Sequence, residues 1–285
     1  MSAIAGLDHV LIGVRDLEAA RAAYARLGFT ATPRGRHTGW GTANYCLMFA
    51  GDYIELLGIV DPGAFTNDLD RFLERREGLL GLAFACDDAE TAHAALRAAG
   101  IAAAPPKALS RALELAEGAV EPRFRLVHLP PEASPGLSAF LCQHLTPGII
   151  RRPAWLEHPN GALGIAAVTT VVADPPALRD AYARLLGPGA TTPTDDVLAA
   201  RAGKTALIFA TPDDFATLYP EVEPPPDDAL PLPAALTIAV ADPAQTARLL
   251  DAGGVAYMRE AKGALVVTPD HAHGVALEFA TAAGG

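Results

Sequence analysis

The sequence has few cysteines, no cluster of basic residues and no unbroken apolar run near its start. Each of these features excludes a class of protein. Three cysteines without CxxC spacing favour reduced thiols over a disulfide framework. A formal net charge of -11 with scattered Lys and Arg argues against a nucleic-acid surface. Asp8, His9 and Arg15 interrupt the first apolar run, so we expect neither a signal peptide nor a membrane span there. We expect a soluble cytoplasmic protein that binds a small molecule, with no nucleic-acid or membrane partner; a homodimer is left open.

A pattern of apolar strand, Asp, Ala-rich helix and glycine occurs four times in the 285 residues, and its copies begin near Leu7, Gly81, Ala166 and Ala234. Each Asp stands where a helix N-cap belongs, and each glycine where a C-cap belongs. Further strand-like segments follow the helices. This repetition predicts four βαβββ modules in an α+β fold, paired into two tandem halves.

Two proline-rich segments interrupt the repeat. Residues 147–162 contain three prolines and a Pro-Asn-Gly turn, so we place the boundary there, with halves at 1–150 and 151–285. Residues 219–233 are predicted to be an exposed connection between the third and fourth modules. Residues 67–79 alternate apolar and charged side chains at helical spacing, which predicts a surface helix linking the first two modules.

A hairpin is predicted where two apolar runs flank Ala50 and Gly51. A two-residue turn there sets Glu55 opposite Cys46. The period of two along a strand then puts further side chains on the face of Glu55, namely Trp40, Thr42, Asn44 and Met48. That face is unusually polar for a strand inside a core.

The four modules, the first-strand histidine and "YIELLGI" at the end of the first module resemble the vicinal oxygen chelate superfamily of glyoxalases, extradiol dioxygenases and bleomycin-resistance proteins. The segments "RHTGWGTANYCLMFAGDYIELLGI" and "FLCQHLTPGIIRRPAWLEHPNGA" are similar to its glyoxalase-like-domain group. The resemblance implies two pseudo-symmetric halves with curved mixed sheets, each forming an open trough. It also implies a divalent metal held by His, Gln or Glu from first and last strands.

The resemblance assigns residues to this metal site. His9 lies seven residues before Asp16, at the position of the family's first-strand ligand, and Glu55 matches the last-strand carboxylate. We therefore expect His9 and Glu55 to be the catalytic residues and metal ligands of the N-terminal half. In the other three modules, the residue seven positions before the capping Asp has no side chain that can bind a metal. These residues are Gly81, Ala167 and Ala235. The C-terminal half keeps Glu278 and is expected to be a structural copy, unless His271 and His273 turn inward.

The family uses three ligands, and the sequence leaves the third open among His37, Cys142, Gln143 and His144. The ion, if one binds, would be Zn, Ni, Mn or Fe. We expect a small-molecule ligand to be bound by His37, Trp40, Asn44, Cys46, Cys142 and His144.

Two functions remain open. The first is a lyase or isomerase, with or without a divalent metal, acting on an oxygen-rich small metabolite in the N-terminal trough. The second is a non-catalytic protein that sequesters a ligand, as in the bleomycin-resistance branch. A dioxygenase is not expected, because four-module dioxygenases of this fold keep their iron in the C-terminal half. In either case, we expect the imidazole of His9 to lie close to the Glu55 carboxylate, sharing a divalent ion with it or hydrogen-bonded to it.

Overall fold

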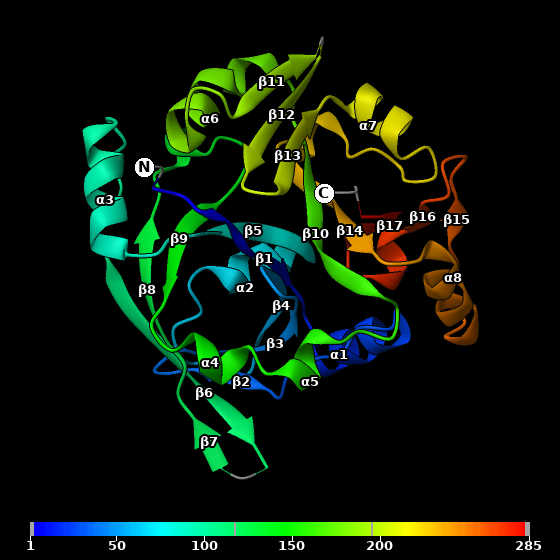
Figure 1. Ribbon diagram of the computed structural model, residues 1–285, viewed down its shortest axis with the longest axis horizontal. Coiled ribbons are helices and arrows are strands. Elements are labelled where there is room, and N and C mark those ends of the chain that lie inside the picture. The colour runs from blue at the N-terminus through cyan, green and yellow to red at the C-terminus, as the bar shows by residue number, and fades with distance from the viewer. Residues whose placement is uncertain (1–2, 117, 195, 283–285) are drawn as a thin grey trace.

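Two curved mixed sheets form the framework of the protein. A computed structural model describes residues 3–116, 118–194 and 196–282 (Figure 1). The strands of the first sheet come from residues 6–144 and those of the second from residues 162–281. The predicted α+β class, with two halves of curved mixed sheets, is confirmed.

The first sheet closes on itself. Its strands follow the order β2-β3-β4-β1-β5-β9-β8-β6-β7, and β2 also pairs with β6. The open trough implied by the resemblance is therefore a closed ring of eight strands in this half, with β7 extending β6 as a hairpin. The bounds are β1 Gly6–Gly13, β2 Gly35–His37, β3 Thr42–Met48, β4 Tyr53–Ile59, β5 Gly78–Ala85, β6 Lys107–Leu115, β7 Gly118–Val120, β8 Arg123–His128 and β9 Ala139–His144.

The second sheet has eight strands in the order β11-β12-β13-β10-β14-β17-β16-β15. Part of its inner face is filled by apolar side chains: Phe215 of helix α7 (Pro212–Leu218) and the adjacent Tyr219 are buried against Ala235 and Ala276. The strand bounds are β10 Ala162–Val171, β11 Thr191–Thr194, β12 Val197–Ala202, β13 Thr205–Ala210, β14 Leu232–Val240, β15 Met258–Arg259, β16 Leu265–Val267 and β17 Ala276–Thr281.

The Asp caps appear where the repeat predicts them. The side chains of Asp16, Asp88 and Asp242 accept hydrogen bonds from backbone amides in the first turns of α1 (Leu17–Arg26), α3 (Ala89–Ala98) and α8 (Pro243–Ala252). In the third copy, Asp174 instead caps a 3-10 turn that precedes α6 (Arg179–Leu186). Two prolines directly after Asp174 account for this difference, because their missing amides and fixed φ suit a tight turn.

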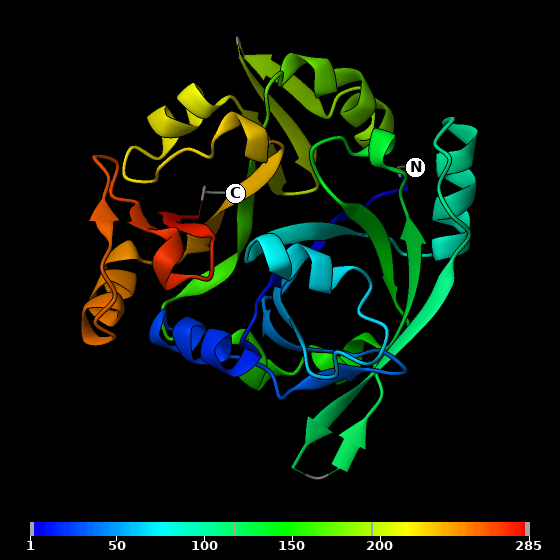
Figure 2. The ribbon, with the colours of Figure 1, turned by 180° about the vertical axis from the view of Figure 1, so that it is seen from behind.

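The helix predicted over residues 67–79 is shorter and less exposed than expected. Helix α2 spans Leu69–Arg75, and the chain from Gly78 onward joins the sheet as β5. Leu69 is 1% exposed and packs with Phe72 against side chains of β1 and β4. Figure 2 shows α2 in front of the opening of the first sheet, so this helix covers one end of the barrel.

The proline-rich segment between the sheets runs along the rim of the barrel at the end opposite α2 (Figure 1). It forms two short helices, α4 (Pro147–Ile150) and α5 (Pro153–Leu156). Ile150 is 1% exposed, and it packs with Trp155 in a cluster that contains Met48 and Phe124 of the barrel. The segment is therefore part of the packing of the first half.

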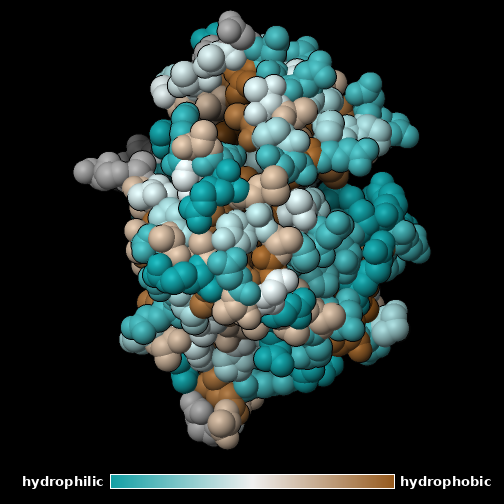
Figure 3. Space-filling view, turned by 90° about the vertical axis from the view of Figure 1, so that its right-hand side faces the viewer, coloured by the Kyte–Doolittle hydropathy of each residue, from teal (hydrophilic) through white to brown (hydrophobic). Residues whose placement is uncertain are grey.

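The two halves share one continuous apolar core. Phe29 and Phe279, from different halves, place their ring centroids 6.0 Å apart, and the Asn160 side chain donates to the carbonyl of Leu27 at 2.9 Å. The face in Figure 3 shows hydrophobic residues in small patches among hydrophilic ones, as is usual for protein surfaces. No helix in the described parts of the chain has the length and apolar character needed to cross a membrane.

His158 also joins the two halves, although its Pro-Asn-Gly context predicts no more than a turn. Its Nδ1 accepts a hydrogen bond from the Thr30 amide at 3.0 Å, and its Nε2 donates to the Met48 carbonyl at 2.9 Å. Burial lowers the pKa of His158, with the Met48 carbonyl opposing this effect. The ring must stay neutral, since a protonated Nδ1 could not accept from Thr30.

We expect His158→Ala to lower the free energy of unfolding by about 3 kcal/mol, because two buried hydrogen bonds and ring packing are lost. The pKa of His158 is lower in the folded than in the unfolded state, so its stabilisation is complete above the unfolded pKa and is lost as the pH falls below about 6.5. Urea unfolding at about pH 7.5 and about pH 5.5 measures both effects. His93→Ala on α3 is the control, and an equal loss of stability with acid in wild type and His158→Ala would contradict the assignment.

Candidate functional site

A cavity of about 220 Å³ lies in the closed barrel of the N-terminal half. Its polar lining includes His9, His37, Glu55 and Arg111, and its apolar lining includes Leu109, Phe124, Leu126 and Phe140. These residues come from β1, β2, β4, β6, β8 and β9, so closure of the ring gathers them around one space.

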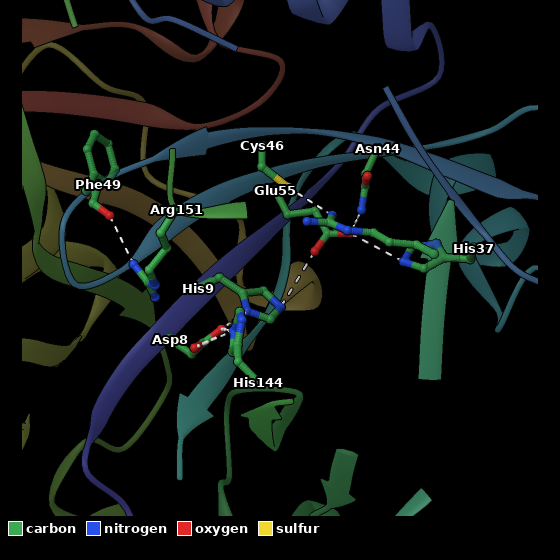
Figure 4. A network of polar contacts seen from close by, with 10 residues as sticks. Asp8, His9, His37, Asn44, Cys46, Phe49, Glu55, His144 and Arg151 are labelled. Carbon is green, nitrogen blue, oxygen red and sulfur yellow. Dashed lines mark hydrogen bonds and ion pairs between the residues drawn. The ribbon is translucent and has the colours of Figure 1, made fainter. Parts of the chain in front are cut away.

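Glu55 is the buried carboxylate of this cavity and is 5% exposed. It stands opposite Cys46 in the hairpin, in the register that the two-residue turn predicts. The Asn44 amide donates to Glu55 Oε1 at 2.7 Å, while His9 Nε2 lies 3.6 Å from Oε2 and His37 Nε2 lies 3.8 Å from Oε1 (Figure 4). Burial raises the pKa of Glu55, but His9, His37, Arg111 and Asn44 together lower it below its usual value. The carboxylate is therefore ionised near neutral pH.

Both imidazoles are oriented through their other ring nitrogen. His9 Nδ1 lies 2.6 Å from Asp8 Oδ1, and His37 Nδ1 lies 2.8 Å from Thr42 Oγ1. Tyr53 stacks on His9, with ring centroids 4.4 Å apart. Burial lowers the pKa of His37, against the opposing effect of Glu55. In each ring the anchored Nδ1 leaves Nε2 facing the Glu55 carboxylate, an arrangement typical of metal-binding and catalytic histidines.

Asp8 connects His9 to a third histidine. His144 Nε2 lies 3.0 Å from Asp8 Oδ1 and 2.9 Å from Oδ2 (Figure 4). Burial raises the pKa of Asp8, but hydrogen bonds from His144 and His9 outweigh burial and lower it. His144 therefore contacts Asp8, and through it His9, and it is not among the residues that line the cavity.

The other predicted ligand-binding residues divide into two groups. Trp40 and Cys142 line the cavity with His37, whereas Asn44 and Cys46 lie behind its wall. Asn44 holds Glu55, and Cys46 Sγ receives a hydrogen bond from Arg111 Nη1 at 3.1 Å. Their roles in binding stay predictions.

Three alternative metal ligands lie elsewhere. Gln143 accepts from the Ala89 amide and donates to the Asp87 carbonyl at the start of α3. His273 turns away from the inner face of its own sheet, and its Nδ1 lies 3.2 Å from Glu77 Oε2 of the other half. Glu278, the carboxylate of the C-terminal half, accepts from Thr237 Oγ1 at 2.6 Å.

Arg111 and Asp8 belong to the site but are not predicted by the sequence patterns. Arg111 reaches the cavity because β6 pairs with β2, a contact between strands from different modules. Asp8 is the extra residue of a bulge between Leu7 and His9 in the pairing of β1 with β5. A bulge re-aims side chains at a sheet, and strict alternation does not show it. The adjacency of Asp8 to His9 was the available signal.

Two sets of side chains offer donor atoms for a divalent metal. Asp8, His9 and Cys142 form a cluster whose donor atoms lie within 4.8 Å of one another. The 2.6 Å contact between Asp8 and His9 is a hydrogen bond, shorter than the roughly 3.4 Å between two donors on one tetrahedral zinc. Burial also raises the pKa of Cys142 well above the usual value, which disfavours the thiolate that a metal needs. This cluster does not fit a metal.

The second set is His9 Nε2, His37 Nε2 and the Glu55 carboxylate. Its separations of 3.6 and 3.8 Å are too long for hydrogen bonds and close to those of neighbouring ligands on one ion. Two imidazoles and one carboxylate are a common donor set for Zn and non-haem Fe. The donor types suit a divalent ion, but the three donor atoms do not all lie within 4.8 Å of one another, so an ion held here would require these side chains to draw together.

Comparisons with solved structures agree with this architecture. A hypothetical protein from Staphylococcus aureus is 11% identical, with a TM-score of 0.70 over 97% of this chain and 99% of that chain. A variant of 4-hydroxymandelate synthase from Streptomyces coelicolor is 15% identical, with a TM-score of 0.62 over 99% of this chain and 95% of that chain. Both show similarity of fold alone. No curated protein gives a significant sequence match.

The family profile described as a glyoxalase-like domain matches residues 7–186. The matched segment contains His9 and Glu55 and all of the first sheet except Gly6. The chain therefore belongs to the glyoxalase-like domain family, within the vicinal oxygen chelate superfamily.

Proposed function

We propose that the chain is an enzyme of the lyase or isomerase class that moves a proton on a small oxygen-bearing metabolite in the N-terminal cavity. The observation that supports it is the ionised, buried Glu55, flanked by two anchored imidazoles on a cavity wall. A carboxylate that only stabilised the fold would need no cavity beside it.

Glu55 is proposed as the base. Asn44 fixes one oxygen of its carboxylate, Oε1, so Oε2 is the atom that accepts a proton from a carbon next to a substrate carbonyl. The proton then returns to an adjacent atom in an isomerase, or to the leaving group in a lyase. The lowered pKa of Glu55 keeps the carboxylate ionised, and so able to accept a proton, near neutral pH.

His9 is proposed as the partner of Glu55 in this transfer. Its Nδ1–H is held by Asp8, so the Nε2 lone pair faces Oε2 and can receive the proton from Glu55. The imidazolium that results is stabilised by the Asp8 carboxylate. His144 keeps Asp8 in place from the other side.

A divalent ion would be held by His9, His37 and Glu55. When bound, it supplies Lewis-acid polarisation of a substrate oxygen. The charges support this set, because the buried groups at the cavity include two carboxylates, Glu55 on the wall and Asp8 behind His9, against one permanent cation, Arg111. A divalent ion and an anionic substrate together balance that excess.

Deuterium exchange tests the proposal. We expect the protein to catalyse incorporation of deuterium from D2O next to the carbonyl of small compounds such as pyruvate, 2-oxobutyrate or hydroxyacetone, followed by proton NMR. Glu278→Gln, which changes the carboxylate of the other half, should exchange as fast as the wild type. Binding of these compounds without exchange would overturn the proposal and favour the ligand-sequestering function.

A further inference from the structure

Arg111 is a buried cation with unused hydrogen-bonding capacity. It is 2% exposed and lines the cavity. Its Nη1 donates to Cys46 Sγ, but within the described part of the chain Nε and Nη2 have no hydrogen-bond partner. Native proteins rarely leave buried donors unpaired, because desolvation without a partner is costly. A ligand in the cavity is the natural partner for these two donors.

The two free nitrogens form one edge of the guanidinium. In this planar group the Nε–H bond and one Nη2–H bond point the same way, and their spacing matches the two oxygens of a carboxylate. Nη1, the atom already used by Cys46, belongs to the other side. The edge left free is therefore the one suited to bidentate binding.

The charge of Arg111 is offset in part by Glu55 across the cavity, but in the part of the chain that the structure describes the guanidinium has no carboxylate in direct contact. No carboxylate of the described residues forms an ion pair with it, and the Glu55 oxygens face Asn44, His9 and His37. Burial raises the pKa of Cys46 to about 11, although Arg111 itself opposes this, so Cys46 is a neutral thiol. The Phe124 ring, whose centroid lies 5.6 Å from the guanidinium carbon, supplies only a weak cation–π contact.

Gly35 on β2, which has no side chain, leaves space for the side chain of Arg111. A Cβ at Gly35 would collide with Asn44 Oδ1 and lie 3.2 Å from Arg111 Cδ. The β2–β6 pairing, with Gly35 opposite Leu113 and His37 opposite Arg111, holds the strand in this position. The barrel closure thus places the guanidinium and the base Glu55 on one cavity.

We propose that Arg111 binds the carboxylate of the substrate through Nε and Nη2, so that the metabolite is a small carboxylic acid. Its apolar part would contact Leu109, Leu126 and Phe140, which line the same cavity. This inference rests on the proposed function, because it orients an acid so that the carbon near its carboxylate faces Glu55.

Equilibrium binding of benzoate and its neutral analogue benzamide tests the inference without turnover. By calorimetry, we expect benzoate to bind the wild type roughly tenfold or more tightly than benzamide. Arg111→Met should abolish this preference and keep the fold, because an apolar side chain of similar length is usually tolerated in place of a buried charge. Arg125→Met, on neighbouring β8 and paired with Glu90 at the surface, is the control and should keep the preference.

NMR of the wild type provides a readout that does not depend on a variant. We expect benzoate, and not benzamide, to shift the Nε–H resonance of Arg111 downfield. Equal affinities for the two compounds, no binding of benzoate, or an unchanged resonance would overturn the inference. Tighter Arg111-dependent binding of inorganic phosphate than of benzoate would overturn the carboxylate assignment in favour of a phosphate.

Different results would reject the proposed catalysis by Glu55 and the proposed carboxylate site at Arg111. Arg111-dependent benzoate binding with no deuterium exchange on any carbonyl acid would reject the proposed catalysis and retain the carboxylate site. Deuterium exchange that is unchanged in Arg111→Met would reject the carboxylate site and retain Glu55 as the base.

Discussion

Replacing Glu55 with Gln is expected to lower the rate of deuterium exchange by roughly 100- to 10,000-fold, the usual contribution of a general base. Gln has the same shape and keeps an oxygen to accept from Asn44, so the cavity wall should remain intact. It cannot accept a proton near neutral pH. The measurement is the initial exchange rate at saturating substrate, followed by proton NMR.

The matched control for this variant is Glu278→Gln. Glu278 occupies the equivalent place in the C-terminal half, where its carboxylate accepts from Thr237. Exchange at the wild-type rate in Glu278→Gln and a large loss in Glu55→Gln would locate the base in the N-terminal barrel. A Glu55→Gln variant that keeps most of the wild-type rate would show that another group removes the proton.

Local patterns predicted the parts of the fold that depend on neighbouring residues. The Asp caps at Asp16 and Asp88 follow from hydrogen bonds within one helical turn. The register of Glu55 opposite Cys46 follows from the length of one turn. The expected closeness of His9 and Glu55 is also present, because β1 and β4 are adjacent strands of one module.

Contacts between distant segments could not be predicted in the same way. Closure of the ring depends on the pairing of residues 35–37 with residues 111–113. Neither segment contains a sequence pattern that predicts which strand it pairs with. The burial of Ile150 in the linking segment likewise depends on a cavity end made by other strands. The prolines of that segment predict a boundary, yet two of them also begin short helices, and the first of these helices buries Ile150.

The two halves illustrate how one architecture supports different uses. In the C-terminal half, the ligand positions hold Ala167 and Ala235, and Phe215 with Tyr219 fills the inner face. In the N-terminal half, the corresponding space is walled by His9, Glu55 and Arg111. The shared apolar core joins the halves, so the filled half can support the barrel against which the site is built.

Replacing His9 with Ala is expected to abolish retention of a divalent ion, since the three proposed donors fall to two. Asp8→Asn keeps His9 but weakens the hydrogen bond that orients it, so affinity for the ion should fall roughly 10- to 100-fold. Protein purified without a chelating tag, equilibrated with Zn, Ni, Mn or Fe and analysed by plasma mass spectrometry, gives the stoichiometry for each variant.

His271→Ala, in the C-terminal half, is the control and should retain the ion like the wild type. A graded result, with full binding in this control, reduced affinity in Asp8→Asn and none in His9→Ala, would place the ion beside Glu55. Retention in His9→Ala would contradict the assignment, because the imidazole facing Glu55 at 3.6 Å would then contribute nothing to binding. Undetectable binding in the wild type would reject the metal site and leave Glu55 and His9 to act by proton transfer alone.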